Sequence, residues 1–361
     1  MLAFAATAAS AQTAPASAWV DPDKAPSETM PLAAKSLLLD VVRCANRYLA
    51  IGGRGDVLLS DDANTWRQVT VPTRATLTAA AAIDAQAWAV GHDGVIVHSA
   101  DGGEHWVVQR DDPLKTGAGA GGDPQQGAPL LDVLFLDTHR GFAVGAYSLA
   151  LSTTDGGEHW EAMKVAADVS DGADADDDGA PSKSQPKGKA AKNDKQTFSE
   201  EELKVGQEAT PHLNAIAHTG SGALLIVGER GSAFRSRDDG KTWKRLQLPY
   251  DGSMFGVIGY DADRVVAFGL RGHVYESSDL GDHWQTVQTG TELSLMGGAA
   301  LPGGGAVIVG ANGLVLTRAA FGQPLRSGVD ERAGILANAL PLDDGRFLLV
   351  GENGASVFQP K

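Results

Sequence analysis

The sequence is poor in the residues that crosslink small secreted domains. Cys44 is the only cysteine in 361 residues, which excludes an intrachain disulfide and a zinc site built from cysteines. We expect Cys44 to be a small buried residue in a strand. Aromatic residues make up only 6% of the chain, whereas glycine occurs 45 times. Because tight turns use glycine and long helices avoid it, this composition favours an all-β fold.

Positive charge and long apolar runs are also scarce. The chain has 30 basic against 45 acidic residues, a formal net charge of −15. That balance opposes a broad attraction to nucleic-acid phosphates or anionic lipid headgroups, so we expect no nucleic-acid partner. Beyond the first residues, no stretch approaches the roughly 18 uninterrupted apolar residues of a membrane-spanning helix. We therefore expect a protein that does not itself span a membrane.

One apolar stretch stands at the start of the sequence, at residues 2–11. It ends in Ala9-Ser10-Ala11, which has the small-x-small form of a signal-peptidase site. The pattern predicts that residues 1–11 are the remainder of a signal peptide and that the protein is periplasmic or otherwise exported. The basic residues that usually precede such a stretch are missing, which leaves the true start of the chain open.

A repeated unit with a period near 40 residues is the main signal in the sequence. Each copy has an apolar run, a glycine, two variable residues, usually a second glycine, and then an alternating run. A period of this size accommodates four short strands and their turns, which is one blade of a β-propeller. Seven copies predict a single seven-bladed propeller over residues 12–361, with four antiparallel strands in each blade. The anchoring glycines, at intervals of 39, 54, 83, 41, 41 and 41 residues, are Gly52, Gly91, Gly145, Gly228, Gly269, Gly310 and Gly351.

Two intervals are longer because they contain segments of a different composition. Residues 111–129 include a run of glycine and alanine, and residues 166–205 are rich in Asp, Glu and Lys with almost no large apolar side chains. Such segments bury too little apolar surface to offset the entropy cost of ordering them. We expect both to be disordered inserts.

The Gly-x-x-Gly of each unit should form the hairpin between the second and third strands of a blade. We expect its two glycines to supply the positive φ angles that tight hairpins require. The last unit ends after its third strand, and residues 17–20 (Ser-Ala-Trp-Val) have the signature of the missing fourth one. The sequence therefore predicts that this N-terminal segment pairs with residues 355–358 and closes the ring.

Five units carry an acidic turn of the form Ser/Thr-x-Asp-x-Gly-x-x-Trp, one residue shorter in the first unit. The aspartate can accept hydrogen bonds from backbone N–H groups of its own turn, and the tryptophan can fill the space between blades. Because the pattern recurs from blade to blade, we interpret it as scaffolding rather than as a catalytic or calcium site. Its residues are Asp62, Asp101, Asp155, Asp238 and Asp279, with Trp66, Trp106, Trp160, Trp243 and Trp284.

Apparent cofactor motifs do not fit their context. The Gly-x-Gly-x-x-Gly at residues 117–122 neither follows a predicted strand nor opens a helix, and the Gly-Lys-Thr at 240–242 lacks the leading glycine of a P-loop. Histidines recur beside the turn tryptophans, which packing explains better than metal ligation. We expect no cofactor, no metal and no catalytic residue.

The combination of Gly-x-x-Gly and Ser-x-Asp-x-Gly-x-x-Trp over residues 37–358 resembles the photosystem II stability and assembly factor-like propellers, which carry Asp-box (bacterial neuraminidase) repeats. It is most similar to their relatives in non-photosynthetic bacteria. The resemblance implies a non-enzymatic binding or assembly module for a membrane or envelope protein, with exporter complexes among the candidates. Nothing in the sequence reports photosynthesis.

A glycoside hydrolase is the alternative, because sialidases and xyloglucan hydrolases also carry Asp boxes. The Arg-Ile-Pro or Arg-Leu-Pro signature of sialidases is absent here, and no Tyr and Glu pair can be singled out as nucleophile and partner. Xyloglucan-type enzymes place their carboxylates between two propellers, whereas the repeats of this chain account for a single propeller. The sequence therefore favours a binding module over a glycoside hydrolase.

The predicted partner site is the face formed by the Gly-x-x-Gly hairpins. Arg54, Arg230 and Arg271 occupy the same position of Gly-x-Arg-Gly in three units, and turn geometry gives an acidic protein little reason to repeat arginine there. The family that the chain resembles presents an arginine patch on one propeller face, which the resemblance carries over to these three positions. His92 and Tyr147 fill related positions in other units. The competing interpretation is solvated charge at hairpin tips.

Overall fold

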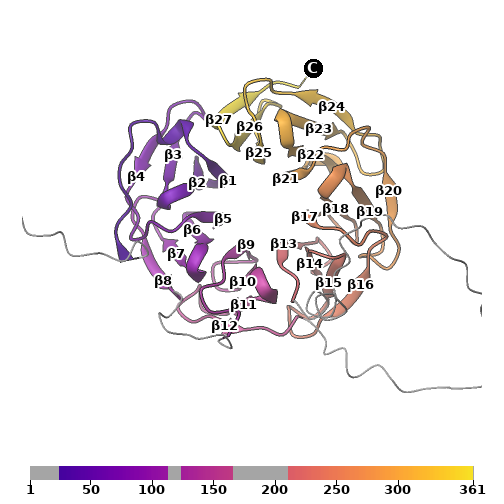
Figure 1. The fold of residues 1–361 in the computed structure, drawn as a ribbon, viewed down its shortest axis with the longest axis horizontal. Coiled ribbons are helices and arrows are strands. Elements are labelled where there is room, and N and C mark those ends of the chain that lie inside the picture. Colours follow the sequence, from indigo (N-terminus) through magenta and orange to yellow (C-terminus); the bar gives the residue numbers. More distant parts are fainter. Residues whose placement is uncertain (1–23, 113–122, 166–209, 361) are drawn as a thin grey trace, which may run out of the picture.

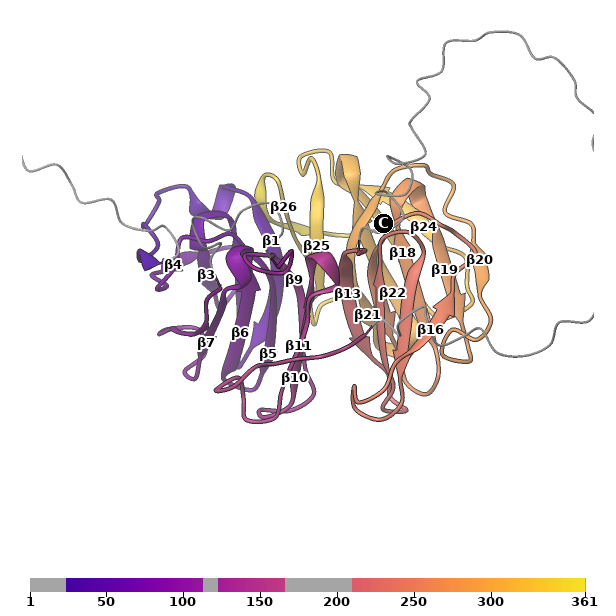
Figure 2. The same cartoon turned by 60° about the horizontal axis from the view of Figure 1, so that its bottom comes forward.

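The computed structural model describes residues 24–112, 123–165 and 210–360, and these residues form seven antiparallel sheets around a central axis (Figure 1). Within each sheet the strands follow one another in chain order from the axis to the rim. Figure 2 shows the same sheets from the side, standing beside one another as blades. The predicted seven-bladed, all-β propeller is confirmed. No helix in the described ranges has the length and apolar character needed to cross a membrane.

The first four blades follow the chain from its start. Blade 1 holds β1 (Leu38–Cys44), β2 (Arg47–Gly52), β3 (Val57–Ser60) and β4 (Arg67–Val69). Blade 2 holds β5 (Leu77–Ile83), β6 (Gln86–Gly91), β7 (Ile96–Ser99) and β8 (Val107–Arg110). Blade 3 holds β9 (Leu130–Phe135), β10 (Gly141–Gly145), β11 (Ala150–Thr153) and β12 (Glu161–Ala162). Blade 4 holds β13 (Leu213–His218), β14 (Leu224–Gly228), β15 (Ser232–Ser236) and β16 (Lys244–Gln247).

The last three blades complete the ring. Blade 5 holds β17 (Met254–Gly259), β18 (Val265–Gly269), β19 (Val274–Ser277) and β20 (Gln285–Val287). Blade 6 holds β21 (Leu295–Leu301), β22 (Gly305–Gly310), β23 (Leu314–Arg318) and β24 (Arg326–Val329). Blade 7 holds β25 (Leu336–Pro341), β26 (Phe347–Gly351) and β27 (Gly354–Phe358). The short 3-10 turns are η2 (Ala33–Lys35), η3 (Gly53–Gly55), η4 (His92–Gly94), η5 (Ala146–Ser148), η6 (Leu270–Gly272), η7 (Pro302–Gly304) and η8 (Ala311–Gly313).

The second strand of each blade is covered on both sides, because neighbouring blades pack against both faces of the sheet. In β10, β14, β18, β22 and β26 every residue is buried. This explains why these strands are continuous apolar runs in the sequence rather than alternating ones. The core is accordingly divided into seven apolar clusters, each lying between two adjacent blades.

Each anchoring glycine is required by a close approach of two backbone segments. At Gly52 an added Cβ would lie 2.2 Å from the carbonyl oxygen of Leu37, just before the inner strand. That carbonyl accepts a hydrogen bond from the N–H of Gly53. The same approach, 2.1–2.4 Å, occurs at the other six anchors. The repeat period seen in the sequence is therefore the spacing of one backbone contact made in every blade.

The prediction that both glycines of each Gly-x-x-Gly have positive φ angles was wrong for the first glycine. Gly52 has a φ of −174°, which is extended backbone that any residue adopts. The positive φ values fall on the third and fourth residues of the turn, Arg54 at 56° and Gly55 at 72°. Of these two glycines, only the second has the positive φ that was predicted for both.

The ring closes by packing between blades 1 and 7. The inner strand β1 contacts β25 and β26, and Leu38, Leu348 and Val350 share one buried cluster. The turn η2 covers the start of β27. Blade 7 has three strands in the described part of the chain rather than four. The segment predicted to supply the fourth, residues 17–20, lies outside the described residues.

The end of the first predicted insert, residues 123–129, belongs to the described part of the chain. Residues 123–129 form a turn in which Ala128 is buried and its N–H donates to the carbonyl of Gln125. The side chain of Gln125 also donates to the carbonyl of Tyr147 in blade 3. These polar contacts to a neighbouring turn hold the segment. Residues 113–122 and the second insert, 166–205, lie outside the described residues.

Candidate binding face

The hairpins between second and third strands gather on one face of the ring, which we call the 3-10 face. It consists of η3, η4, η5, residues 229–231, η6, η8 and residues 352–353. Figure 1 is viewed from this side, with the 3-10 turns drawn in front of the strands. The face carries one variable turn from each blade, so its chemistry is set by the residues at the tips.

Three arginines and one tyrosine occupy left-handed backbone on this face. The third turn residue has a φ of 54–57° in six blades, as Arg54, Asp93, Tyr147, Arg230, Arg271 and Asn312. Asn and Asp tolerate this region well, whereas other side chains cost of order 1–3 kcal/mol there. Turn geometry therefore accounts for Asp93 and Asn312 but disfavours the arginines and Tyr147.

The structure brings only part of the predicted site together. Arg230 and Arg271 lie in the adjacent blades 4 and 5, and Tyr147 lies next to them in blade 3. Arg54 is in blade 1, across the central channel from blades 4 and 5 (Figure 1). His92 precedes the left-handed position of blade 2, which Asp93 fills. A single partner segment on blades 3–5 would therefore meet two of the three arginines.

The connections between blades 3, 4 and 5 add aromatic groups beside these tips. The exposed ring of Tyr147 packs edge-on against His212, with centroids 5.1 Å apart. Tyr250 stacks on His273 at 4.0 Å, in the connection that leads to blade 5. A pocket beside Arg230 is also lined by Arg245 and Asp251. Sequence reasoning predicted Tyr147 and Arg230 but missed the others, His212, Tyr250, His273, Arg245 and Asp251, because they lie outside the repeated motif.

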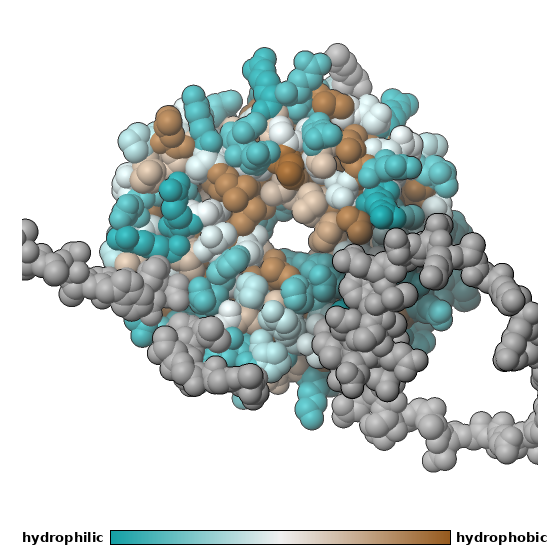
Figure 3. Space-filling view, in the orientation of Figure 1, coloured by the Kyte–Doolittle hydropathy of each residue, from teal (hydrophilic) through white to brown (hydrophobic). Residues whose placement is uncertain are grey.

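Apolar side chains lie close to the central channel on the same side. Leu37 and Ile335, which precede the inner strands of blades 1 and 7, are 46% and 49% exposed, and Met296 in β21 is 37% exposed. Figure 3 shows hydrophobic residues around the mouth of the channel with polar ones further out. The 3-10 face thus offers an apolar centre and a partly cationic rim.

Two carboxylates join inner strands within the channel wall. One oxygen of Asp40 in β1 accepts the N–H of Ala80 in β5, 2.8 Å away, and the amide of Asn338 donates to its other oxygen. Asp132 in β9 accepts the N–H of Ile216 in β13, also at 2.8 Å. Burial raises the pKa of Asp40 from its usual range, and burial together with the charge of Asp40 raises the pKa of Asp132 to about 7. Each of these two carboxyl groups thus links the inner strands of different blades through hydrogen bonds.

The raised pKa of Asp132 predicts a pH-dependent contribution to stability. Folding favours the protonated carboxyl, so this contribution is present at acid pH and is lost as pH rises through about 7. The free energy of unfolding of Asp132→Asn, relative to wild type, should therefore increase between pH 5 and pH 8. Urea denaturation at both values measures the difference, and a pH-independent difference would contradict the assignment.

The acidic turns lie on the opposite face, between third and fourth strands. In Asp101 one oxygen accepts the N–H of His105 at 3.0 Å while the other pairs with its Nδ1 at 2.6 Å. These bonds hold the pKa of Asp101 well below its usual range. Asp155 and Asp279 make the same contacts with His159 and His283, and Asp62 and Asp238 bond instead to the N–H and hydroxyl of Thr65 and Thr242.

The turn tryptophans pack between their own blade and the preceding one. Trp106 of blade 2 lies in the cluster with Leu49 and Leu59 of blade 1, and its Nε1 donates to Gly103 within its own turn. The same arrangement between adjacent blades holds for Trp66, Trp160, Trp243 and Trp284. The aspartates of these turns are thus occupied with local hydrogen bonds, and the tryptophans with packing between blades.

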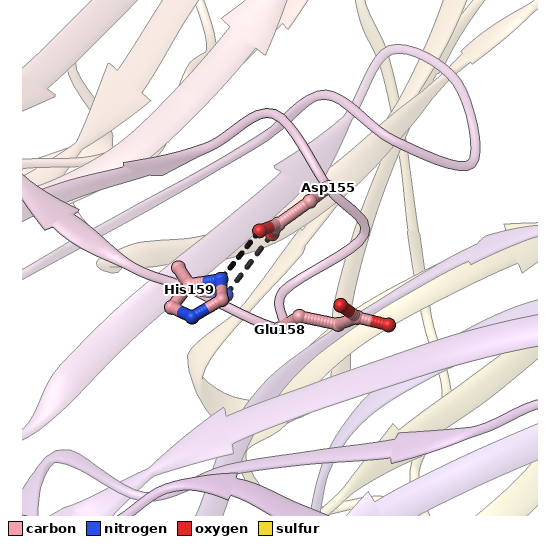
Figure 4. Close-up of side chains that lie close together, drawn as sticks. All are labelled: Asp155, Glu158 and His159. Carbon is pink, nitrogen blue, oxygen red and sulfur yellow. Dashed lines mark hydrogen bonds and ion pairs between the residues drawn. The ribbon is translucent and has the colours of Figure 1, made fainter.

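One acidic turn also contains three residues whose side chains could together bind a cation. Asp155, Glu158 and His159 place one potential ligand atom each within 4.8 Å of the others (Figure 4). However, the carboxylate of Asp155 already bonds the backbone and the Nδ1 of His159. The equivalent pairs Asp101–His105 and Asp279–His283 have the same geometry. We therefore attribute the proximity of these three side chains to the conformation of the turn and not to metal binding.

The sequence matches no protein-family model and no curated protein. Solved structures share its fold. The chain is similar to the structure described as YCF48 bound to D1 peptide, with a TM-score of 0.62 and 16% identity over 95% of this chain and 96% of that one. It is also similar to YCF48 from Cyanidioschyzon merolae (TM-score 0.61, 15% identity, 93% and 99% covered) and to the WD40 β-propeller domain of Doa1 (0.61, 12%, 94% and 97%). At these identities the likeness shows the propeller fold alone.

Proposed function

We propose that this protein is a binding module, not an enzyme, and that it recognises an acidic segment of a protein partner on the 3-10 face. The observation that carries the proposal is the left-handed backbone at Arg230, Arg271 and Tyr147. Side chains that the turn disfavours stand at these tips, where they project from the rim of the ring, and this supports a role in recognition. Arginine in particular can bind a carboxylate through two parallel N–H groups.

The channel carboxylates do not favour the glycosidase alternative. Asp40 and Asp132 both accept backbone N–H groups of neighbouring strands, so their oxygens hold blades together. A glycosidase needs a pair of carboxyl groups, or a tyrosine and its partner, free to reach a sugar. The geometry of these two residues supports a structural role.

The sequence resemblance and one structural neighbour support the proposed class of partner. The neighbour described as YCF48 bound to D1 peptide is a propeller that takes a peptide ligand. We propose a membrane or envelope protein as the partner, with exporter components among the candidates, and a periplasmic or otherwise exported location. The location rests on Ala9-Ser10-Ala11, which lies outside the described residues.

Charge reversal at blades 4 and 5 should abolish partner capture. Immobilised wild-type protein and an Arg230→Glu/Arg271→Glu variant would be compared on solubilised native envelope, with captured proteins quantified by mass spectrometry. The variant should retain about a tenth or less of the partner, because repulsion replaces attraction. Arg54→Glu should have a smaller effect, since Arg54 lies across the channel.

A matched control lies in the same blade as Arg230. Lys241 is exposed in the acidic turn on the opposite face, so Lys241→Glu makes the same kind of charge change away from the site. It should capture the partner at the wild-type level. Equal capture by the wild type and the folded Arg230→Glu/Arg271→Glu variant would overturn the proposed site.

A further inference from the structure

The outer strand of blade 2 differs from the other outer strands. In five blades the first residue of the outer strand is charged or polar. In blade 2 it is Val107, followed by Val108, and these side chains are 59% and 41% exposed. The first residues of the outer strands, in blade order from 1 to 6, are Arg67, Val107, Glu161, Lys244, Gln285 and Arg326.

The two valines project from opposite faces of the strand. Val107 is paired with His98 and Val108 with Val97, and paired residues of antiparallel strands share a face. Val97 belongs to the cluster between blades 1 and 2, whereas His98 faces blade 3. An added strand would therefore find an apolar neighbour on each side of the sheet.

The outer backbone edge of β8 has no strand partner among the described residues. The strand pairs with β7 on one side, and its other edge makes no backbone hydrogen bond to any described residue. In blade 1, by contrast, residues 27–30 lie along the rim and bond to Gln68 and Val71. Proteins usually protect such edges with charged side chains, because a free apolar edge pairs with other strands. Arg67, Glu161 and Lys244 serve that purpose in their blades, whereas Val107 does not.

A groove runs beside this edge, between blades 2 and 3. It has a volume of about 720 Å³ and is lined by His98, Val107 and Gln109 on one side and by residues 155–158 on the other. The amide of Gln109 donates to the carbonyl of Gly156 at 2.9 Å. The groove is thus bounded by a fixed turn and is wide enough for side chains.

The far wall of the groove carries Glu158, which makes no hydrogen bond and no ion pair with a lysine or arginine in the described ranges. Its carboxylate lies within 4.8 Å of His159, whose Nδ1 is already bonded to Asp155. Its equivalents in two other turns are neutralised, Glu104 by Arg47 and Arg67, and Asp282 by Arg235 and Lys244. The groove therefore favours a basic side chain at this end.

We propose that β8 and this groove bind an extended segment of a partner protein, which adds to blade 2 as a fifth strand. Its apolar side chains would pack on Val107 and Val108, and a lysine or arginine would reach Glu158. A second copy of this chain fits less well, because it would bring another Glu158 and a net charge of −15 to the same edge. The site is distinct in blade and in charge from the 3-10 face.

A defined peptide tests this assignment. The probe is a short fluorescent peptide in which valine and threonine alternate between terminal lysines, with binding followed by anisotropy. Wild-type protein should bind it, and Val107→Lys/Val108→Lys should weaken binding about tenfold or more. Glu158→Gln should weaken binding of the lysine peptide, and a peptide with terminal glutamates should bind worst. A proline at the centre of the peptide should remove binding, because it interrupts the backbone hydrogen bonds.

Two control variants change charge away from this edge. Gln285→Lys alters the equivalent position of blade 5 and should leave binding unchanged. Arg230→Glu/Arg271→Glu should also leave peptide binding unchanged, because it alters only the 3-10 face. The peptide test therefore gives a result of its own even if that face does not bind the proposed partner. Absence of binding, or equal binding by wild type and Val107→Lys/Val108→Lys, would overturn the proposal. Concentration-dependent dimerisation that Val107→Lys/Val108→Lys abolishes would assign the edge to a second copy instead.

Discussion

The Gly52→Ala variant should lose about 3 kcal/mol of unfolding free energy, although it adds a single methyl group. The new Cβ would lie 2.2 Å from the carbonyl oxygen of Leu37 and 2.9 Å from the Cα of Leu38. Both atoms belong to the backbone that leads into β1, so neither can move without displacing the inner strand at the seam of the ring. Thermal and urea denaturation measure the loss.

The neighbouring glycine provides the control. An added Cβ on Gly53 would meet nothing within 4 Å, so Gly53→Ala should leave stability unchanged or raise it by a few tenths of a kcal/mol, at most about 1. The two variants differ by one position in the same turn. Similar stabilities for the two would show that the close approach at Gly52 is not a constraint on the fold.

The Glu276→Leu variant should be destabilised by about 3–5 kcal/mol, because it leaves a buried guanidinium without its counter-ion. Arg318 in β23 is 1% exposed in its side chain, and its Nη1 donates to Oε2 of Glu276 in β19 at 2.6 Å. The pair joins blades 5 and 6. Phe321 lies 5.1 Å from the guanidinium carbon but carries no charge to replace the carboxylate.

A double-mutant cycle distinguishes the pair from simple loss of packing. Glu276→Leu/Arg318→Leu removes both charges, so it should recover much of the stability lost by Glu276→Leu alone. Asp344→Ala breaks an ion pair whose side chains are 40% and 51% exposed, and it should leave the free energy of unfolding almost unchanged. A double variant as unstable as the sum of the single variants would contradict a role for the ion pair.

Features that repeat within one blade could be predicted from the sequence. The seven anchoring glycines mark one backbone contact made in each blade, so their period counts the blades directly. The acidic turns were also readable, because Asp101 bonds to residues three and four positions along the chain. Positive φ was assigned to both glycines of each pair, although the first is extended, because the motif records which residues a turn contains and not which of them takes the left-handed position.

Features that depend on ring closure could not be read in this way. Arg54, Arg230 and Arg271 share one motif, yet only the order of blades around the axis decides that Arg230 and Arg271 are neighbours and that Arg54 lies across the channel. The Arg318–Glu276 pair joins residues 42 positions apart in adjacent blades. The irregular connections, where Tyr250 and His212 lie, carry no periodic signal.

The sequence by itself determined the number of blades, the position of their turns and the residues at the tips, because each of these follows from short-range backbone contacts repeated along the chain. The tertiary structure alone decided which tips lie together, which carboxylates lie between inner strands, and that the edge of β8 lies beside a groove with Glu158 on its far wall. These depend on how one blade packs against the next. Packing between blades is set by side chains that differ from copy to copy, so the repeat could not reveal it.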